Sequence, residues 1–569
     1  MDGRVVDPRH PLSRVVHLPN LNAMARLGVN FVNTYADTPL CAPSRASMFT
    51  GRRASSIEAW NNVKGIAVDV TEWPPQTADP NCAAVIGYGE EVCLEMGQRQ
   101  NVSSTITQAM AAQGYTVSLH GKMDTGGGPS MNPPTTFAHG FHGTGTWSAN
   151  PLDRHHATQA STYDFPGVVL HSWATGANIP KPIFGPLGSP NHIDDEHANS
   201  SESQDWLTVD ECVQFLREYR PGDAPFFLYC SVLNPHPPYT SNATYEASVD
   251  LEQLEASVRM ASKTWLSRSS THPADMYMSR SEAVPGDFDT ELARRLALAY
   301  FGQIAETDAM LGRVVSALMG SEAAPSTYTV FASDHGEMRM EHRLIEKMAM
   351  YEGSARVPLL VTGPGVPSGV TVSDVSSLID LFPTFLDMSQ ATRLPDAGLQ
   401  GYSLAPYLGI QPRRGLHSRP QQVVAEYFGE HANTPQFMLR VGDWKYIAYG
   451  REPPYQNYRA RLFNVTADPL EVEDLAGSPS FQAVVDKLDT QLRSVTDYPS
   501  ITKLVNAENR AHVRRWMEAN AQEDKWKELF LSAFDGADDD DVSRFLRWLH
   551  VSGEFAPEAT PPEAASLFV

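Results

Sequence analysis

The sequence has no run of 18 or more apolar residues, and basic side chains are far fewer than acidic ones. Without such a run, it predicts no membrane-spanning helix. Its 44 lysines and arginines against 67 aspartates and glutamates give a formal net charge of −23. This charge excludes a general nucleic-acid binder, because such proteins need a basic surface. An anionic substrate would therefore depend on a local cluster of cationic side chains.

Cysteine is also scarce, since the 569 residues include five of them. An odd number leaves at least one thiol outside any disulfide. If Cys41 is that thiol, the other four can pair, and Cys82 with Cys93 would close a short loop. Four N-glycosylation sequons give weak support for a secretory route; they begin at Asn101, Asn199, Asn242 and Asn464.

Length and composition predict a globular chain with more than one domain. A chain of 569 residues is too long for one small core, and 42% hydrophobic residues exclude wholesale disorder. Strand-like and helix-like stretches alternate through the first four hundred residues, which indicates an α/β domain with a largely parallel sheet. Helices are predicted at 20–27, 103–113, 206–219 and 291–319, and strands at 29–35, 115–119, 225–232, 327–332 and 357–362.

The composition changes near residues 410–420, and short antiparallel strands are predicted after it at 421–427, 437–441, 444–449 and 461–463. Residues 506–551 have an amphipathic helical pattern. We therefore expect a catalytic domain at 1–410, a smaller α+β subdomain with an antiparallel sheet at 420–500, and a helical tail at 501–569. Residues 124–200 are expected to form long loops over the active face. The acidic run 538–541 lacks the alternating spacing of a calcium loop and indicates a solvated helix start.

One short window carries a chemical signature. Residues 41–52 are Cys-Ala-Pro-Ser-Arg-Ala-Ser-Met-Phe-Thr-Gly-Arg, which fits C-x-P-S-R-x-x-x-x-T-G at every fixed position. Elsewhere a lone cysteine beside a Pro-Ser turn would be interpreted as a buried structural residue. This window, however, resembles the signature around the catalytic residue of type I sulfatases. The resemblance implies that Cys41 is converted to formylglycine by a formylglycine-generating enzyme that recognises Pro43 and Arg45, and that Arg45 orients the hydrated aldehyde.

Sulfate-ester hydrolysis needs a nucleophile, cationic groups for the sulfate oxygens and a proton donor for the leaving alcohol. The candidates stand at the carboxyl ends of predicted strands, where open α/β sheets bind their ligands. Asp334 and His335 directly follow the strand 327–332, and a carboxylate at that position suits a hard cation such as Ca²⁺. Their order after Cys41 matches the family, which implies one Ca²⁺ ion held by residues 41, 334 and 335.

Two lysines and a histidine complete the predicted site. Lys122 closes another strand and fits the Gly-Lys position of the family, although Asp124 stands where many relatives have histidine. Lys347 fits the second sulfate-binding lysine. His236 lies in Asn-Pro-His-Pro-Pro-Tyr after the strand 225–232, where the prolines fix a loop that can aim the imidazole as leaving-group acid or sulfate ligand.

The resemblance extends over nearly the whole chain and implies further properties. Asn61 and Asn62, just after the signature, would contact substrate. The fold would be alkaline-phosphatase-like, and the enzyme lysosomal or secreted, removing 2-O-sulfate from uronate residues of glycosaminoglycan-like chains. The family begins with a signal peptide and a buried strand that supplies a metal-binding aspartate; we expect both to be encoded upstream of Met1.

Two alternatives to this interpretation stay open. One is a phosphate or phosphonate ester hydrolase of the same superfamily. The other is a catalytically inactive protein with the sulfatase fold that binds glycans.

Overall fold

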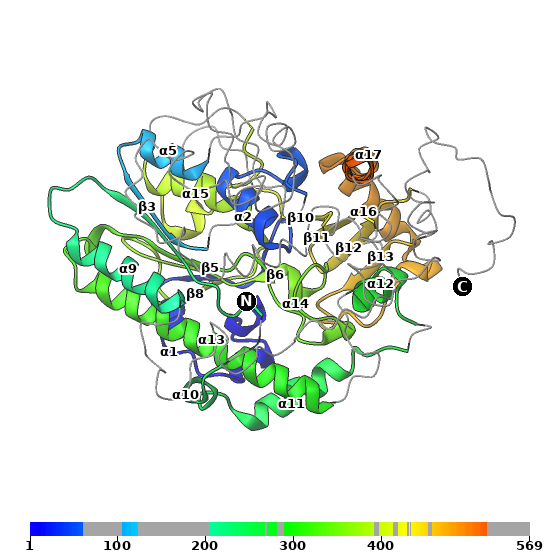
Figure 1. The fold of residues 1–569 in the computed structure, drawn as a ribbon, viewed down its shortest axis with the longest axis horizontal. Coiled ribbons are helices and arrows are strands. Elements are labelled where there is room, and N and C mark those ends of the chain that lie inside the picture. The colour runs from blue at the N-terminus through cyan, green and yellow to red at the C-terminus, as the bar shows by residue number, and fades with distance from the viewer. Residues whose placement is uncertain are drawn as a thin grey trace, which may run out of the picture.

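The computed structural model describes residues 1–60, 105–122, 204–237, 239, 241–267, 270–281, 290–391, 398–412, 419–429, 432, 434–452 and 458–519. Its helices are α1 Pro19–Leu27, α2 Cys41–Thr50, α5 Ile106–Ala112, α9 Gln204–Glu218, α10 Ala243–Glu246, α11 Leu251–Ser262, α12 Pro273–Ser281, α13 Thr290–Met319, α14 Glu352–Ala355, α15 Leu381–Met388, α16 Gln482–Val495 and α17 Tyr498–Ala519. Its strands are β1 Val29–Phe31, β2 Thr34–Tyr35, β3 Thr116–Gly121, β4 Phe226–Ser231, β5 Thr329–Ala332, β6 Arg356–Val357, β7 Leu359–Thr362, β8 Val370–Val372, β9 Ser376–Ser377, β10 Gln422–Tyr427, β11 Gln436–Val441, β12 Trp444–Tyr449 and β13 Arg461–Asn464 (Figure 1).

The strands of the first four hundred residues form three sheets. One has the order β5-β7-β1-β8, another the order β6-β2-β9, and β3 pairs with β4. The β3–β4 and β1–β8 pairs are parallel, whereas β7 runs antiparallel to both β1 and β5. The α/β architecture is as predicted, but its described strand pairs are parallel and antiparallel in equal number rather than largely parallel. The predicted strands 29–35 and 357–362 are each divided between two sheets, the first into β1 and β2 and the second into β6 and β7.

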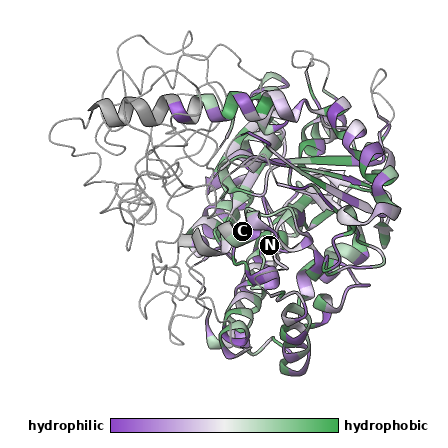
Figure 2. Ribbon diagram, turned by 90° about the vertical axis from the view of Figure 1, so that its right-hand side faces the viewer, coloured by the Kyte–Doolittle hydropathy of each residue, from purple (hydrophilic) through white to green (hydrophobic). Residues whose placement is uncertain are grey.

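Helix α13 is the longest described helix, and its sequence explains how it packs. Leu296, Tyr300 and Ile304 recur every four residues and are fully buried, which places them on one face of the helix. The other face carries ion-paired arginines, such as Arg313 with Asp210 of α9. The same division between apolar and polar faces is visible as green and purple bands along the helices in Figure 2.

The C-terminal sheet was predicted closely. Strands β10 to β13 form a meander in which each neighbouring pair is antiparallel, and α16 packs on it. Helix α17 begins at Tyr498, three residues before the predicted helical tail 501–569, and the tail beyond residue 519 lies outside the described residues. The same holds for residues 124–200 and for the acidic run 538–541.

Among the described cysteines, Cys212 and Cys230 form a disulfide that links α9 to β4, and Cys41 is free. Cys82 and Cys93 lie outside the described residues. So do the sequons at 101 and 199. Asn242 is 5% exposed and its side chain caps α10 by accepting from the Thr244 N–H, which is unfavourable for a glycan. None of the described helices is long and apolar enough to cross a membrane.

Candidate active site

Cys41 is the first residue of α2. The preceding residue, Leu40, is extended with φ −154° and ψ 141°, and the helix ends at Gly51, which has φ 63°. A left-handed residue at that place favours glycine. Because the first N–H groups of a helix have no intrahelical partner, the helix start is electropositive. The thiol is 4% exposed and therefore lies in a buried, positive environment.

The side-chain nitrogens of a lysine and a histidine converge on the Cys41 sulfur. Lys122 Nζ lies 3.3 Å from Sγ and His335 Nε2 lies 3.2 Å from it. Burial alone would raise the pKa of the Cys41 thiol, but Lys122, Lys347 and His335 hold this pKa well below its usual value. The pocket around residue 41 therefore stabilises negative charge.

Lys122 is placed by a close approach of two parallel strands. Gly121, the last residue of β3, has φ +81°, and a Cβ on it would lie 1.9 Å from the Ser231 carbonyl oxygen. Only glycine fits there. The Lys122 N–H donates to the same oxygen at 3.0 Å. The side chain is thus anchored where β3 and β4 end together.

Arg45 connects the strand ends that carry the site. Its Nε forms a 2.9 Å ion pair with Asp334, which follows β5. Its Nη1 donates to the Lys122 carbonyl oxygen at 2.7 Å and to Tyr229 and Ser231 of β4 at 3.0 and 2.9 Å. Although burial opposes ionisation, Arg45 and neighbouring cations hold the pKa of Asp334 well below its usual range.

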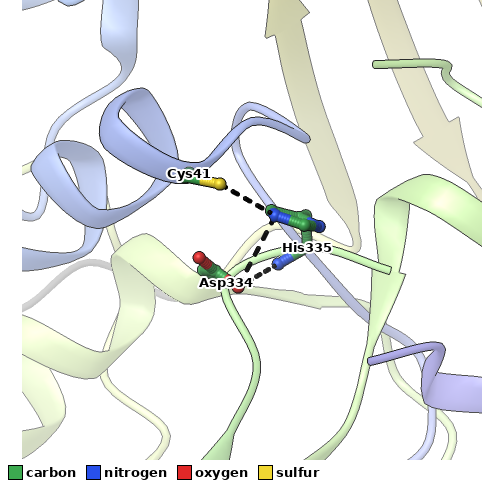
Figure 3. Close-up of side chains that lie close together, drawn as sticks. All are labelled: Cys41, Asp334 and His335. Atoms are coloured by element: carbon green, nitrogen blue, oxygen red, sulfur yellow. Dashed lines mark hydrogen bonds and ion pairs between the residues drawn. The ribbon is translucent and has the colours of Figure 1, made fainter. Parts of the chain in front are cut away.

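Cys41, Asp334 and His335 form the one group of potential metal ligands found among the described residues (Figure 3), with ligand atoms within 4.8 Å of one another. His335 Nδ1 lies 2.9 Å from the Gly336 carbonyl oxygen, which leaves Nε2 free to bind a cation. A carboxylate, an imidazole and the side chain at position 41 suit a divalent cation, and the carboxylate oxygens are the donors that Ca²⁺ prefers. Nearby Asp2 is fully buried and already paired with Arg4 and Arg339.

The amino terminus lies beside this group. The Met1 ammonium donates to Ser333 Oγ and to the His335 carbonyl oxygen, both at 2.6 Å.

His236 and Lys347 form a hydrogen-bonded pair, with Lys347 Nζ 2.8 Å from His236 Nε2. The histidine Nδ1 lies 2.6 Å from the Pro237 carbonyl oxygen. A carbonyl only accepts, so Nδ1 carries the proton and Nε2 accepts from the lysine. Burial and the charges of Lys347 and Lys122 lower the pKa of His236 to about 4. The imidazole is therefore neutral in the free protein near pH 7.

The structure thus brings together seven of the nine predicted site residues: Cys41, Arg45, Lys122, His236, Asp334, His335 and Lys347. Asn61, Asn62 and Asp124 lie outside the described residues. The sequence interpretation missed the side chains that hold the site in place. Asp205, for example, accepts from the N–H groups of Leu233 and Asn234 at 2.7 and 2.8 Å and so fixes the loop before His236.

The comparisons with known proteins agree with this geometry. The family model described as sulfatase matches residues 12–391, and the model described as the C-terminal part of N-sulphoglucosamine sulphohydrolase matches residues 340–497. The chain therefore belongs to the sulfatase family, and it is a sulfatase enzyme.

Within that family, the chain is similar to arylsulfatase K. It is 32% identical to arylsulfatase K of Gallus gallus, covering 92% of this chain and 85% of that protein. For Homo sapiens arylsulfatase K the identity is 29%, with the same 92% and 85% coverage. This similarity extends over nearly the whole sequence, as the predicted resemblance to the family required.

Solved structures share the fold. A phosphonate monoester hydrolase of Agrobacterium radiobacter superposes with a TM-score of 0.58 at 22% identity, covering 87% of this chain and 93% of its own. A 2-O GAG sulfatase gives a TM-score of 0.57 at 18% identity, covering 88% and 90%. The predicted alkaline-phosphatase-like fold with a C-terminal sheet is confirmed.

Proposed function

We propose that this sulfatase hydrolyses sulfate esters with formylglycine at position 41 and one Ca²⁺ ion. The observation that carries the proposal is the convergence of Lys122 and His335 on the side chain at 41, at 3.3 and 3.2 Å. Side chains that stabilise a negative charge on the Cys41 sulfur are also suited to stabilise the negatively charged oxygens of a sulfate ester. Asp334, His335 and residue 41 would hold the cation, which would supply positive charge to the sulfate oxygens.

Hydrated formylglycine supplies one hydroxyl to attack sulfur and a second whose deprotonation lets sulfate depart and restores the aldehyde. The chain's own residues place the ester for this chemistry. Lys122 binds a sulfate oxygen beside residue 41, and Lys347 binds another from the His236 side. Arg45 contacts Asp334 and the strand ends, and in this way it fixes the positions of the nucleophile and the lysines relative to one another.

His236 is the proposed acid for the leaving alcohol. It is neutral in the free protein, since its pKa is lowered to about 4. A bound sulfate ester brings negative charge next to the ring, and a nearby negative charge raises the pKa of a histidine. The Lys347 ammonium keeps its own proton because, although burial opposes the charge, Glu346 raises the pKa of this lysine. Once this lysine turns from Nε2, 2.8 Å away in the free protein, to the bound sulfate, Nε2 can take a proton from solvent. The proton is thus supplied only when substrate is present.

For the substrate we propose 2-O-sulfated uronate at the end of a glycosaminoglycan-like chain, cleaved in a lysosomal or secreted setting. The similarity to arylsulfatase K over most of the sequence supports this assignment. The Cys212–Cys230 disulfide supports an oxidising compartment. An enzyme preparation that released 6-O-sulfate from hexosamine, and left 2-O-sulfated uronate intact, would contradict the substrate while leaving the chemistry in place.

The nucleophile is tested by co-expression with a formylglycine-generating enzyme. A hydrazide probe should label the peptide that contains position 41, and Cys41→Ala, made in the same way, should not be labelled. Active protein that carries an unmodified thiol at this position would refute the proposed nucleophile.

A phosphonate or phosphate ester hydrolase is the second candidate, because a solved phosphonate monoester hydrolase has the same fold. Parallel assays of aryl sulfate, aryl phosphate and phosphonate monoesters separate the two. They use unlabelled enzyme from a preparation in which a separate sample has been shown to carry the aldehyde. We expect the highest kcat/KM for the sulfate ester. Aldehyde-bearing, unlabelled enzyme that turns over none of them would instead favour the inactive glycan-binding alternative.

A further inference from the structure

The segment 338–348 reaches Lys347 along an unusual backbone path. Six of its residues have positive φ although none is glycine: Arg339 (47°), Met340 (66°), His342 (54°), Arg343 (63°), Glu346 (60°) and Met348 (79°). Only a few per cent of non-glycine residues adopt such angles. Each costs roughly 1–3 kcal/mol and persists only where the surroundings enforce it. Contacts with neighbouring groups must therefore hold this segment in its strained conformation.

Glu337 makes contacts that hold the two ends of this segment together. Its Oε1 accepts the Arg339 N–H at 3.0 Å and the Glu346 N–H at 2.6 Å. The Met338 N–H donates to the Glu346 carbonyl oxygen at 2.6 Å, so the first and last residues of the loop 338–346 are joined directly. Glu337 is 3% exposed, and water cannot easily replace it as acceptor. One buried carboxylate therefore bridges both ends of the loop.

The closure leads directly to Lys347. On the other side of the lysine, the Met348 N–H donates to the Pro39 carbonyl oxygen at 3.0 Å, two residues before Cys41. Lys347 thus lies between a fixed loop end and the chain that enters α2. Its side chain is 5% exposed, and its Nζ meets His236 at 2.8 Å. A shift of Glu346 would move this ammonium relative to residue 41.

We propose that Glu337 is a positioning residue for sulfate binding. Its carboxylate holds the strained loop 338–346 closed by accepting two backbone N–H groups, and in this way sets Lys347 against His236 and residue 41. The inference depends on the proposed function, in which Lys347 binds a sulfate oxygen. The two hydrogen bonds that Glu337 accepts in this loop come from the backbone of Arg339 and Glu346, and not from residue 41 or the lysine ammonium.

The test is a double-mutant cycle on the formylglycine-containing enzyme with an aryl sulfate as probe. Glu337→Ala leaves two buried N–H groups unpaired and should lower kcat/KM by at least about tenfold. Glu337→Gln should recover most of the loss, since its amide oxygen can accept the same two N–H groups. Because the effect passes through the lysine, Glu337→Ala should add little to Lys347→Ala.

A matched control is available in Asp308 of α13. This buried carboxylate also accepts two backbone N–H groups, those of Leu21 and Asn20 at 2.7 and 3.1 Å, but at the start of α1. Asp308→Ala should lower stability and leave kcat/KM per folded molecule within about twofold of wild type. If Glu337→Ala does not fold, Glu337→Asp, one methylene shorter, takes its place in the cycle.

The outcomes separate this inference from the proposed function. An unchanged rate in Lys347→Ala would refute the sulfate pocket itself. A slow Lys347→Ala together with fully additive losses from Glu337→Ala would overturn only the positioning role. A Glu337→Gln variant as slow as Glu337→Ala would also overturn it, because charge rather than hydrogen bonding would then be required.

Discussion

Two buried lysines show how the catalytic side and the C-terminal sheet of this protein differ. Lys445 of β12 is completely buried, and its Nζ lies 2.7 Å from both Glu352 and Glu471. Lys347 is buried almost as deeply, yet it has one carboxylate partner, Glu346 at 3.1 Å, and it points at His236. The first ammonium is neutralised by two carboxylates, whereas the second keeps charge available for an anion.

The difference teaches that burial alone does not mark a functional lysine. A buried charge must be paired, or the cost of desolvation destabilises the fold. Lys445 meets that need within the protein, together with a third contact to the Met350 carbonyl oxygen at 3.0 Å. The buried charge of Lys347 is stabilised in part by the neutral imidazole of His236 and by the side chain at position 41. We therefore expect the same substitution to cost stability at one lysine and rate at the other.

The largest effect should come from position 41, which belongs to the catalytic side alone. Cys41→Ser cannot be converted to formylglycine and has a single hydroxyl, so any sulfated enzyme it forms cannot expel sulfate. We expect kcat to fall at least ~10³-fold, with the thermal midpoint nearly unchanged. Initial rates with an aryl sulfate and thermal melting check both expectations. A rate within tenfold of wild type would exclude position 41 as nucleophile.

Lys445→Met should have the next largest effect. It leaves Glu352 and Glu471 buried without their common partner, and breaking a buried pair in this way costs about 3–5 kcal/mol. Urea unfolding measures the loss. The kcat/KM per folded molecule should stay close to that of wild type, and a rate defect at preserved stability would show that the two regions are not independent.

Lys347→Met applies the same change to the catalytic side. We expect kcat/KM to fall more than about tenfold, as when one charge-stabilising donor is removed from an active site. The free energy of unfolding should fall by less than in Lys445→Met, since a single carboxylate loses its partner. Equal stability losses in the two variants would contradict the proposed difference.

A smaller effect should appear in the pH dependence of stability, through one carboxyl group within the catalytic side and one at its contact with the C-terminal sheet. Burial raises the pKa of Glu306 to about 7; this residue accepts from Trp206 Nε1 and Asn234 Nδ2, both at 2.9 Å, below the His236 loop. Burial and nearby Glu426 of β10 raise the pKa of Asp37 to about 7.

Unfolded carboxyl groups ionise at about 4, so between that pH and 7 the folded protein binds more protons. This stabilisation is complete at low pH and is lost as the pH rises through 7. Each of these two groups should contribute on the order of 2 kcal/mol more to the free energy of unfolding at pH 5 than at pH 8. Buried histidines such as His236, whose pKa is lowered to about 4, act in the opposite direction, so the test compares each variant with wild type. The loss of stability in Glu306→Gln and in Asp37→Asn should be larger at pH 5 than at pH 8, as measured by urea unfolding at both pH values. A loss that is equal at the two pH values would refute the assignment.

Much of the fold and the site was predictable from the sequence because strong local patterns coincide there. The alternating strands and helices placed Lys122, His236 and Asp334 at strand ends, and the ends of neighbouring strands meet. The β12 prediction, 444–449, matches the strand to the residue, since the segment is rich in aromatic and β-branched residues and is bounded by glycine turns.

What the sequence could not predict was the support around those side chains. No sequence signal marks Glu337 as the acceptor for two N–H groups of the loop that follows it, and six non-glycine residues with positive φ contradict local preference. The mixed direction of β7 and the partners of Arg45 depend in the same way on contacts between segments hundreds of residues apart. Tertiary packing decides these features, and a single sequence does not display it.

The Cys212–Cys230 link has a practical consequence for making this enzyme. It closes a loop with a sequence separation of 18, and a cross-link over a loop of that length contributes about 3 kcal/mol. A reducing cytosol would leave both thiols unpaired and would remove the covalent link between β4 and α9, the helix that carries Asp205. Batches produced there should melt early and lose activity even when position 41 has been fully converted. Counting accessible thiols in each batch would therefore tell a production fault from a catalytic one.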